Sequence, residues 1–145
     1  MIQETIKAKG ELQIKLFGPD GKLKSEKTVP NLVVTTGKTF IAARMVGTPT
    51  AMSHMAIGSG TTDPVVGDTA LETELGRVAL TSSASAGAVV TYVASFGAGT
   101  GTGAVTEAGI LNASSGGTLL CRTEFAVVNK GADDSMSVTW TITVS

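Results

Sequence analysis

The sequence predicts a mainly β, single-domain fold: an antiparallel sandwich or jelly roll with one or two short helices. Glycine is abundant, at 18 of 145 residues, and together with Thr, Ser, Val and Ala it favours short strands joined by tight turns. Several segments alternate apolar and polar residues, as strands with one buried face do. Since no fixed-period repeat and no long linker divides the chain, we expect one domain over residues 1–145.

The clearest strand signal lies at residues 135–145, where small polar and apolar residues alternate without a break. The predicted core anchors on the apolar face are Met136, Val138, Trp140, Ile142 and Val144. The opposite face carries only Ser and Thr. An uncharged, β-branched strand on an open edge invites pairing with other chains, so this strand is either held inside a sheet or paired with a partner. We expect an interior strand.

Residues 1–34 predict a hairpin. Apolar and polar residues alternate over residues 12–16, and Gly-Pro-Asp-Gly at 18–21 supplies a turn. A returning strand over about residues 22–29 ends at Pro30, because proline cannot donate a hydrogen bond to a strand ladder.

This hairpin is rich in lysine. Residues 1–38 hold seven lysines against four carboxylates, although the whole chain has a net charge of −1. Such lysines either keep an exposed strand soluble or dock on an acidic neighbouring subunit. The candidate docking residues are Lys7, Lys9, Lys15, Lys22, Lys24 and Lys27.

Two short helices are predicted between residues 35 and 76, with a short strand between them. Thr35 or Thr36 can cap the first helix, which ends near Gly47. Asp68 can cap the second, a helical turn or two that ends at Gly76.

The second half of the chain predicts a run of strands. Residues 78–106 contain no charged residue, which is typical of buried strands and sometimes of a subunit interface. The strands expected before the closing one lie at Val78–Leu80, Val89–Phe96, Val105–Leu111 and Thr118–Val128.

No catalytic, metal or cofactor site is predicted. The Gly-Lys-Thr at 37–39 lacks the glycine that a phosphate-binding loop needs five positions earlier, where Leu32 stands. His54 is the sole histidine, so a serine nucleophile has no other imidazole base, and one imidazole makes no conventional zinc site. Asp133 and Asp134 read as a plain turn, since no twelve-residue calcium loop surrounds them.

Three charged residues stand next to apolar segments. Glu107 and Arg122 each lie in an otherwise apolar hairpin strand, and Arg77 precedes an apolar strand. We expect a structural ion pair or an interface contact rather than catalysis.

Composition also restricts the partners and the compartment. The small net charge gives no general attraction to nucleic acid or to acidic membranes. Because Cys121 is the single cysteine, no intrachain disulfide can form. No segment is apolar for long enough to span a membrane, and Met1 is followed by a largely polar stretch. We therefore expect a soluble protein made in a reducing cytoplasm.

Four stretches together carry a resemblance that covers most of the chain. They are Met52–Thr62, Asp68–Thr81, Thr106–Phe125 and Val127–Val144. They resemble small structural proteins of tailed bacteriophages, which serve as capsid decoration (cement) proteins or as tail and fibre components.

The resemblance implies a β-rich module of the virion that is made in the host cytoplasm and has no enzymatic activity. We expect a capsid decoration protein that bridges major capsid subunits, stabilises the shell and self-associates as a homo-oligomer. The alternatives are a tail, baseplate or fibre component, and a receptor- or glycan-binding module.

Overall fold

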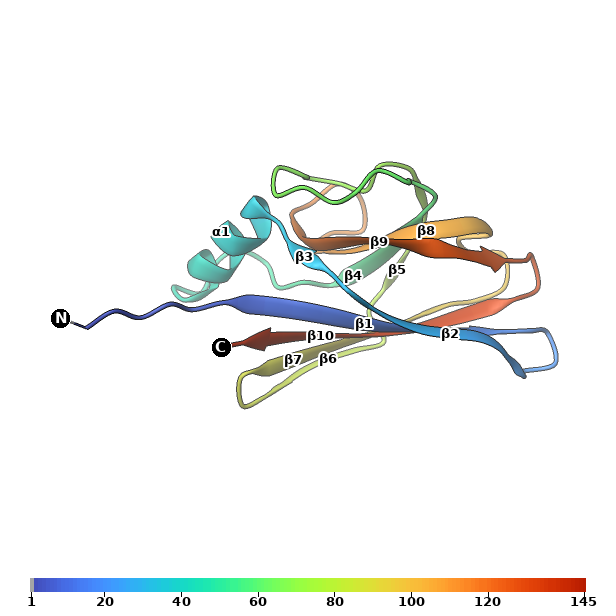
Figure 1. Ribbon diagram of the computed structural model, residues 1–145, viewed down its shortest axis with the longest axis horizontal. Helices are drawn as coiled ribbons and strands as arrows, with labels where there is room; N and C mark the ends of the chain where they lie inside the picture. Colours follow the sequence, from blue (N-terminus) through green and yellow to red (C-terminus); the bar gives the residue numbers. More distant parts are fainter. Residues whose placement is uncertain (1) are drawn as a thin grey trace.

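Two five-stranded antiparallel sheets pack face to face in the computed structural model, which describes residues 2–145 (Figure 1). In spatial order, sheet A contains β2 (Leu23–Pro30), β1 (Ala8–Phe17), β10 (Ser135–Val144), β7 (Val89–Phe96) and β6 (Ser82–Ala86). Sheet B contains β3 (Leu32–Val33), β9 (Leu119–Lys130), β8 (Gly103–Leu111), β4 (His54–Gly58) and β5 (Glu74–Ala79). The prediction of a mainly β sandwich is confirmed.

The closing strand β10 lies inside sheet A, as expected. It pairs with β1 along its whole length and with β7 on its other side. Trp140, which is 0% exposed, stands between Leu12 and Tyr92 on the neighbouring strands. Its indole Nε1 donates a hydrogen bond to Asn31 Oδ1 at 3.0 Å. The strand therefore presents no free edge, and its apolar face forms the centre of the core.

Four of the five predicted core anchors are buried, and the fifth is not. Met136, Val138, Trp140 and Ile142 all belong to the core between the sheets. Val144 is 39% exposed, so its prediction as a core anchor is wrong. It is the last residue of β10 and lines an open hollow beside α1.

The predicted first helix is α1 (Thr35–Arg44). Neither threonine caps it: Val34 occupies the cap position and makes no side-chain cap hydrogen bond. Thr36 Oγ1 instead donates to the Leu119 carbonyl at 2.8 Å, which fastens the helix to β9. A Cβ atom at Gly37 would collide with the Leu120 carbonyl, so glycine stands here because helix and strand approach closely.

The predicted second helix is wrong. Residues 68–73 form an irregular loop and residues 74–79 form β5, so α1 is the one helix among residues 2–145. The physical reason is that a buried carboxylate, that of Glu107, accepts the backbone N–H groups of Glu72 and Thr73. These groups are therefore bonded across the fold and not within a helical turn.

Two strands were not expected, the two-residue β3 and the edge strand β6. The charge-free stretch contains not only the interior strand β7 but also β6, a five-residue strand whose residues are all exposed. The prediction of buried strands thus holds in part for β7, where Ala94 and Phe96 are buried, and fails for β6. Gly87, with φ +57°, makes the tight turn between them, because this conformation is costly for residues with a side chain.

Candidate interaction surfaces

A buried ion pair organises the outer face of sheet B. Arg122 Nε lies 3.0 Å from Glu107 Oε1, and both side chains are almost fully buried. Glu107 also accepts the backbone N–H groups of Gly60, Glu72 and Thr73 at 2.7–2.9 Å. The structural ion pair expected for Glu107 and Arg122 is confirmed, and the three other hydrogen bonds of the carboxylate hold backbone N–H groups in place.

The same cluster fixes the loop of residues 59–73 over sheet B (Figure 1). Arg122 reaches Asp68 Oδ2 at 3.0 Å and the Thr62 carbonyl at 2.9 Å. Beneath the loop lies a second apolar cluster, formed by Val34, Ala56, Leu71, Leu111 and Leu119. The loop and this cluster therefore cover the outer face of sheet B around Arg122 and Glu107.

The outer face of sheet A has no such cover (Figure 1). Its centre is the polar side of β10, where Ser137, Thr139 and Thr141 are partly exposed. Their neighbours across the β7 ladder are Ser95, Val93 and Thr91. This half of the face is uncharged and made of small side chains, which suits close contact with another protein surface.

Two of the six candidate docking lysines hold the hairpin to its own domain. Lys24 Nζ lies 2.9 Å from Asp134 Oδ2, so an ion pair joins β2 to the turn before β10. Lys27 Nζ donates to the Ala126 carbonyl at 2.7 Å and lies 5.9 Å from the centroid of the Phe125 ring. These contacts give both lysines a structural role in the isolated protein.

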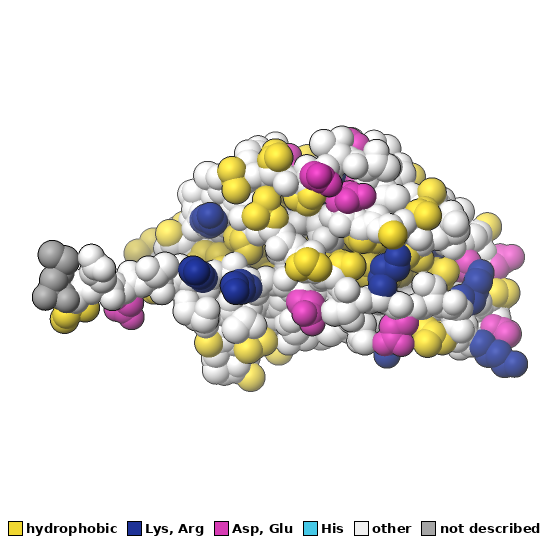
Figure 2. All heavy atoms as spheres, in the orientation of Figure 1, with side chains coloured by type: hydrophobic (Ala, Val, Ile, Leu, Met, Phe, Trp, Pro, Cys, Tyr) yellow, Lys and Arg dark blue, Asp and Glu magenta, His cyan; other side chains and the backbone are white. Residues whose placement is uncertain are grey.

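The other four lysines have no side-chain partner among residues 2–145; they are Lys7, Lys9, Lys15 and Lys22. Lys15 stands opposite Glu26 in the β1–β2 register. Figure 2 shows Lys and Arg side chains gathered toward the two ends of one face, with Asp and Glu beside them. On this face the positive side chains are interspersed with acidic ones, and the docking role of the lysines stays a prediction.

Arg77 also makes an ion pair, as expected. Its guanidinium lies 2.7 Å from Glu74 Oε1 on the same strand, β5. Its Nη1 atom donates to the carbonyls of Ala113 and Gly116 at 2.9 and 2.8 Å. Arg77 therefore ties the edge strand β5 to the turn between β8 and β9.

The four sheet edges differ in how they are protected. In the described structure, β3 has only two residues and leads into α1, β5 carries the Glu74–Arg77 pair, and β2 carries alternating charges before Pro30. The edge strand β6 has neither charge nor proline, and all five of its residues are exposed. Uncharged exposed edges are sites where a further strand can pair.

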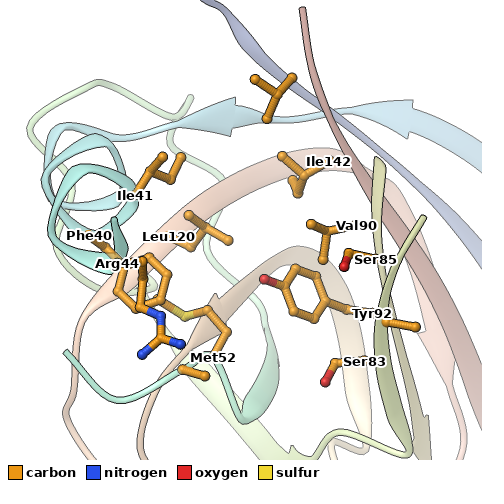
Figure 3. A pocket seen from close by; sticks show the side chains of 13 residues that line it. Phe40, Ile41, Arg44, Met52, Ser83, Ser85, Val90, Tyr92, Leu120 and Ile142 are labelled. Carbon is orange, nitrogen blue, oxygen red and sulfur yellow. The ribbon is translucent and has the colours of Figure 1, made fainter. Parts of the chain in front are cut away.

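Beside β6 an apolar groove opens between the helix and sheet A, with a volume of about 480 Å³ (Figure 3). We call it the α1–β7 groove. Its apolar walls are formed by Phe40, Ile41, Met52, Val90, Tyr92 and Leu120. The inward residues of β6 are Ser83 and Ser85, which face Tyr92 and Val90 in the register. Because these serines are small, they leave the apolar wall uncovered.

Two polar groups, of Tyr92 and Arg44, lie among these apolar walls. In Figure 3 the Tyr92 hydroxyl points into the groove, and the Arg44 guanidinium lies at its rim. Burial raises the pKa of Tyr92 to about 12, so the hydroxyl stays a hydrogen-bond donor. No residue in the described range 2–145 hydrogen-bonds this hydroxyl. The groove could not be predicted from the sequence, because its walls come from segments that are far apart in the chain.

His54 and Cys121 are the single histidine and the single cysteine of the chain. His54 Nδ1 lies 2.8 Å from Ser53 Oγ in a partly buried position. Cys121 is buried, and burial raises the pKa of its thiol. Over residues 2–145 no cluster of three or more His, Cys, Asp or Glu residues is arranged to hold a metal ion. Over the same range, no helix is long and apolar enough to cross a membrane.

Comparison of the chain with family models, with curated proteins and with solved structures found no match.

Proposed function

We propose that this protein is a structural protein of a bacteriophage virion, a capsid decoration protein that binds major capsid subunits and stabilises the shell. The observation that carries the proposal is the asymmetry of the sandwich. The outer face of sheet B is closed by its own loop, whereas the outer face of sheet A is open and largely uncharged around β10 and β7. The resemblance of four stretches to phage structural proteins supports the same role.

The mechanism is burial of surface between this domain and the shell. An interface of roughly 800 Å² on each partner is a common size for specific association. A decoration protein that contacts several subunits at once gains effective affinity even when each contact is weak. The unpaired lysines Lys9, Lys15 and Lys22 steer the domain toward an acidic shell, since such attraction acts mainly on the association rate.

The number of copies per particle tests this proposal. Quantitative mass spectrometry of purified virions should find this protein at a copy number comparable with that of the major capsid protein. A copy number far below that, comparable with tail or baseplate proteins, contradicts the capsid role. Absence from the virion contradicts the proposal as a whole.

A further inference from the structure

The α1–β7 groove is a concave apolar site on the inner side of sheet A. Tyr92 and Val90 lie on the inward face of β7, because Tyr92 stands opposite the fully buried Trp140 in the β10–β7 register. Ser83 and Ser85 of β6 leave these side chains open toward α1. The volume of about 480 Å³ falls in the range of roughly 300–1,000 Å³ that is common for small-molecule sites. The groove is therefore large enough for one small ligand.

Two side chains of this groove have hydrogen-bond donors without a partner. The Tyr92 hydroxyl points into the groove, and no described residue hydrogen-bonds it (Figure 3). Arg44 Nη1 donates to the Pro49 carbonyl at 2.7 Å, which holds the guanidinium at the rim. Among residues 2–145 no other group accepts a hydrogen bond from this guanidinium. A hydroxyl and a guanidinium with free N–H groups suit the oxygens of a carboxylate.

The charge of the lining selects an anion. Arg44 is the one charged residue among the described residues that line the groove, so no carboxylate of the lining competes for it. The neighbouring hollow, which shares Val144 with the groove, is lined by Lys7, Lys9 and Lys38. Among the described residues, no Asp or Glu lines that hollow either. The charges at this end of the domain therefore attract an anionic ligand and repel a cationic one.

The walls of the groove favour an alkyl chain as the apolar part of the ligand. Many wall residues are aliphatic or methionine, among them Ile41, Met52 and Leu120. Such side chains adapt to a flexible apolar chain. Because Tyr92 and Val90 face inward between the layers, a flat protein surface cannot cover them, whereas a slender chain can enter beside β6. The structure thus fits an amphiphile with one anionic group and a single alkyl chain.

We propose that the α1–β7 groove binds a medium-chain alkyl carboxylate, with the chain along the apolar walls and the carboxylate between the Arg44 guanidinium and the Tyr92 hydroxyl. Bound in this way, the ligand pairs the free donors of both side chains and covers the apolar surface that Ser83 and Ser85 leave open. This inference goes beyond the proposed function and does not depend on it, because purified protein tests it without any virion.

The first experiment measures binding of decanoate to the full chain by isothermal titration calorimetry, below the concentration at which decanoate forms micelles. Decanoate should bind at one site per chain. Octanoate should bind at least about tenfold more weakly, because each methylene removed from water contributes about fourfold. Decyltrimethylammonium, which has the same chain and a cationic head, should also bind at least about tenfold more weakly. No saturable binding of decanoate, or equal binding of the cationic amphiphile, overturns the proposal.

The second experiment tests the position of the carboxylate. Arg44→Gln should weaken decanoate binding by at least about tenfold, and Tyr92→Phe by about fivefold, because each removes a hydrogen bond to a charged group. Lys38→Gln removes a cation of the neighbouring hollow from the same helix and should change the affinity by less than about twofold. Circular dichroism checks that the three variants are folded. An unchanged affinity in Arg44→Gln overturns the assignment of the carboxylate to this residue.

The third experiment tests the position of the chain. Ser85→Trp places a large side chain in the groove and should abolish decanoate binding. Ser82→Trp, on the opposite side of the same edge strand, is the matched control and should bind decanoate as the unmodified protein does. Both positions are exposed, so both variants should fold. Equal affinities of the two variants overturn the location of the site.

A final comparison separates a free carboxylate from a membrane surface. Vesicles of phosphatidylglycerol, an anionic phospholipid, are sedimented with the protein and compared with the decanoate titration. The proposal predicts saturable decanoate binding that Arg44→Gln weakens. Sedimentation with the vesicles in the absence of decanoate binding would overturn the assignment of a single-chain carboxylate.

Discussion

At the scale of residues, the buried carboxylate of Glu107 holds the loop of residues 59–73 in place. Glu107 has no exposed surface, and its carboxylate accepts three backbone N–H groups in addition to the Arg122 guanidinium. A group in such surroundings has no water to replace a lost partner, so breaking the set is costly. This residue therefore determines whether the outer face of sheet B stays closed.

Replacing Glu107 by Gln should lower the free energy of unfolding by about 3 kcal/mol, because Arg122 keeps its charge while the carboxylate is gone. Urea unfolding measures the change. Glu74→Gln, which removes the ion-pair partner of Arg77 on an exposed strand, is the control and should cost less than about 1 kcal/mol. Equal losses in the two variants would contradict the role given to Glu107.

Asp134 gives the fold a pH dependence on the acidic side. The hydrogen bond from Lys24, and then that from the Gly131 N–H, lower the pKa of this carboxyl. Since the pKa is lower in the folded protein than in the unfolded chain, the stabilisation is present above the ordinary value and is lost as pH falls through the lowered one.

Asp134→Asn should therefore weaken the dependence of the protein's stability on pH in the acidic range. Thermal unfolding followed between pH 5 and pH 2 should show the unmodified protein losing its advantage over the variant as the carboxyl becomes protonated. The variant Asp133→Asn, one residue earlier in an exposed position, is the matched control and should keep the original pH dependence. Parallel curves for Asp134→Asn and the unmodified protein would show that the Lys24 contact adds nothing.

At the scale of elements, the strands that were predicted correctly are those with a clear alternation of apolar and polar residues or a clear turn at their ends. The strand β7 has the predicted bounds, and β10 is interior as expected. The prediction of the second helix is wrong. Asp68 is a good helix cap and Leu71 and Leu75 have helical spacing, but the carboxylate that binds the backbone here belongs to Glu107, far along the chain. The strand β6 was missed because its Ser-Ala pattern has little β propensity and its pairing depends on the Gly87 turn.

The interior position of β10 makes its two faces respond differently to the same substitution. Trp140→Lys should unfold the domain, because it removes the largest core side chain and buries an ammonium group, at a cost of more than about 5 kcal/mol. Thr141→Lys, on the outer face, should leave the fold intact. Circular dichroism and thermal melting compare the two variants. A folded Trp140→Lys protein would contradict the assignment of this residue to the core.

At the scale of the whole molecule, the two sheets differ in how their outer faces and edges are covered. The loop of residues 59–73 covers the outer face of sheet B. The outer face of sheet A is open, its edge strand β6 has no charge or proline, and the α1–β7 groove lies beside that strand. The sequence indicated the lysine-rich hairpin but not which lysines are free, because the partners of Lys24 and Lys27 lie about a hundred residues further along the chain.

Charge reversal at the free lysines tests the steering role. The double variant Lys15→Glu, Lys22→Glu should bind the particle more slowly at low salt and show a weaker dependence of binding on salt. Lys38→Glu, on α1, makes a charge change of the same kind away from the hairpin and serves as the control. An unchanged salt response in the double variant would reduce these lysines to a means of keeping the hairpin soluble.

Cryo-electron microscopy of phage particles produced together with this protein tests the proposed capsid role most directly. We expect density for the sandwich at repeated sites on the capsid surface, with the outer face of sheet A or the lysine-rich hairpin against major capsid subunits. Density confined to the tail, or a shell contact made through the closed outer face of sheet B, would contradict it.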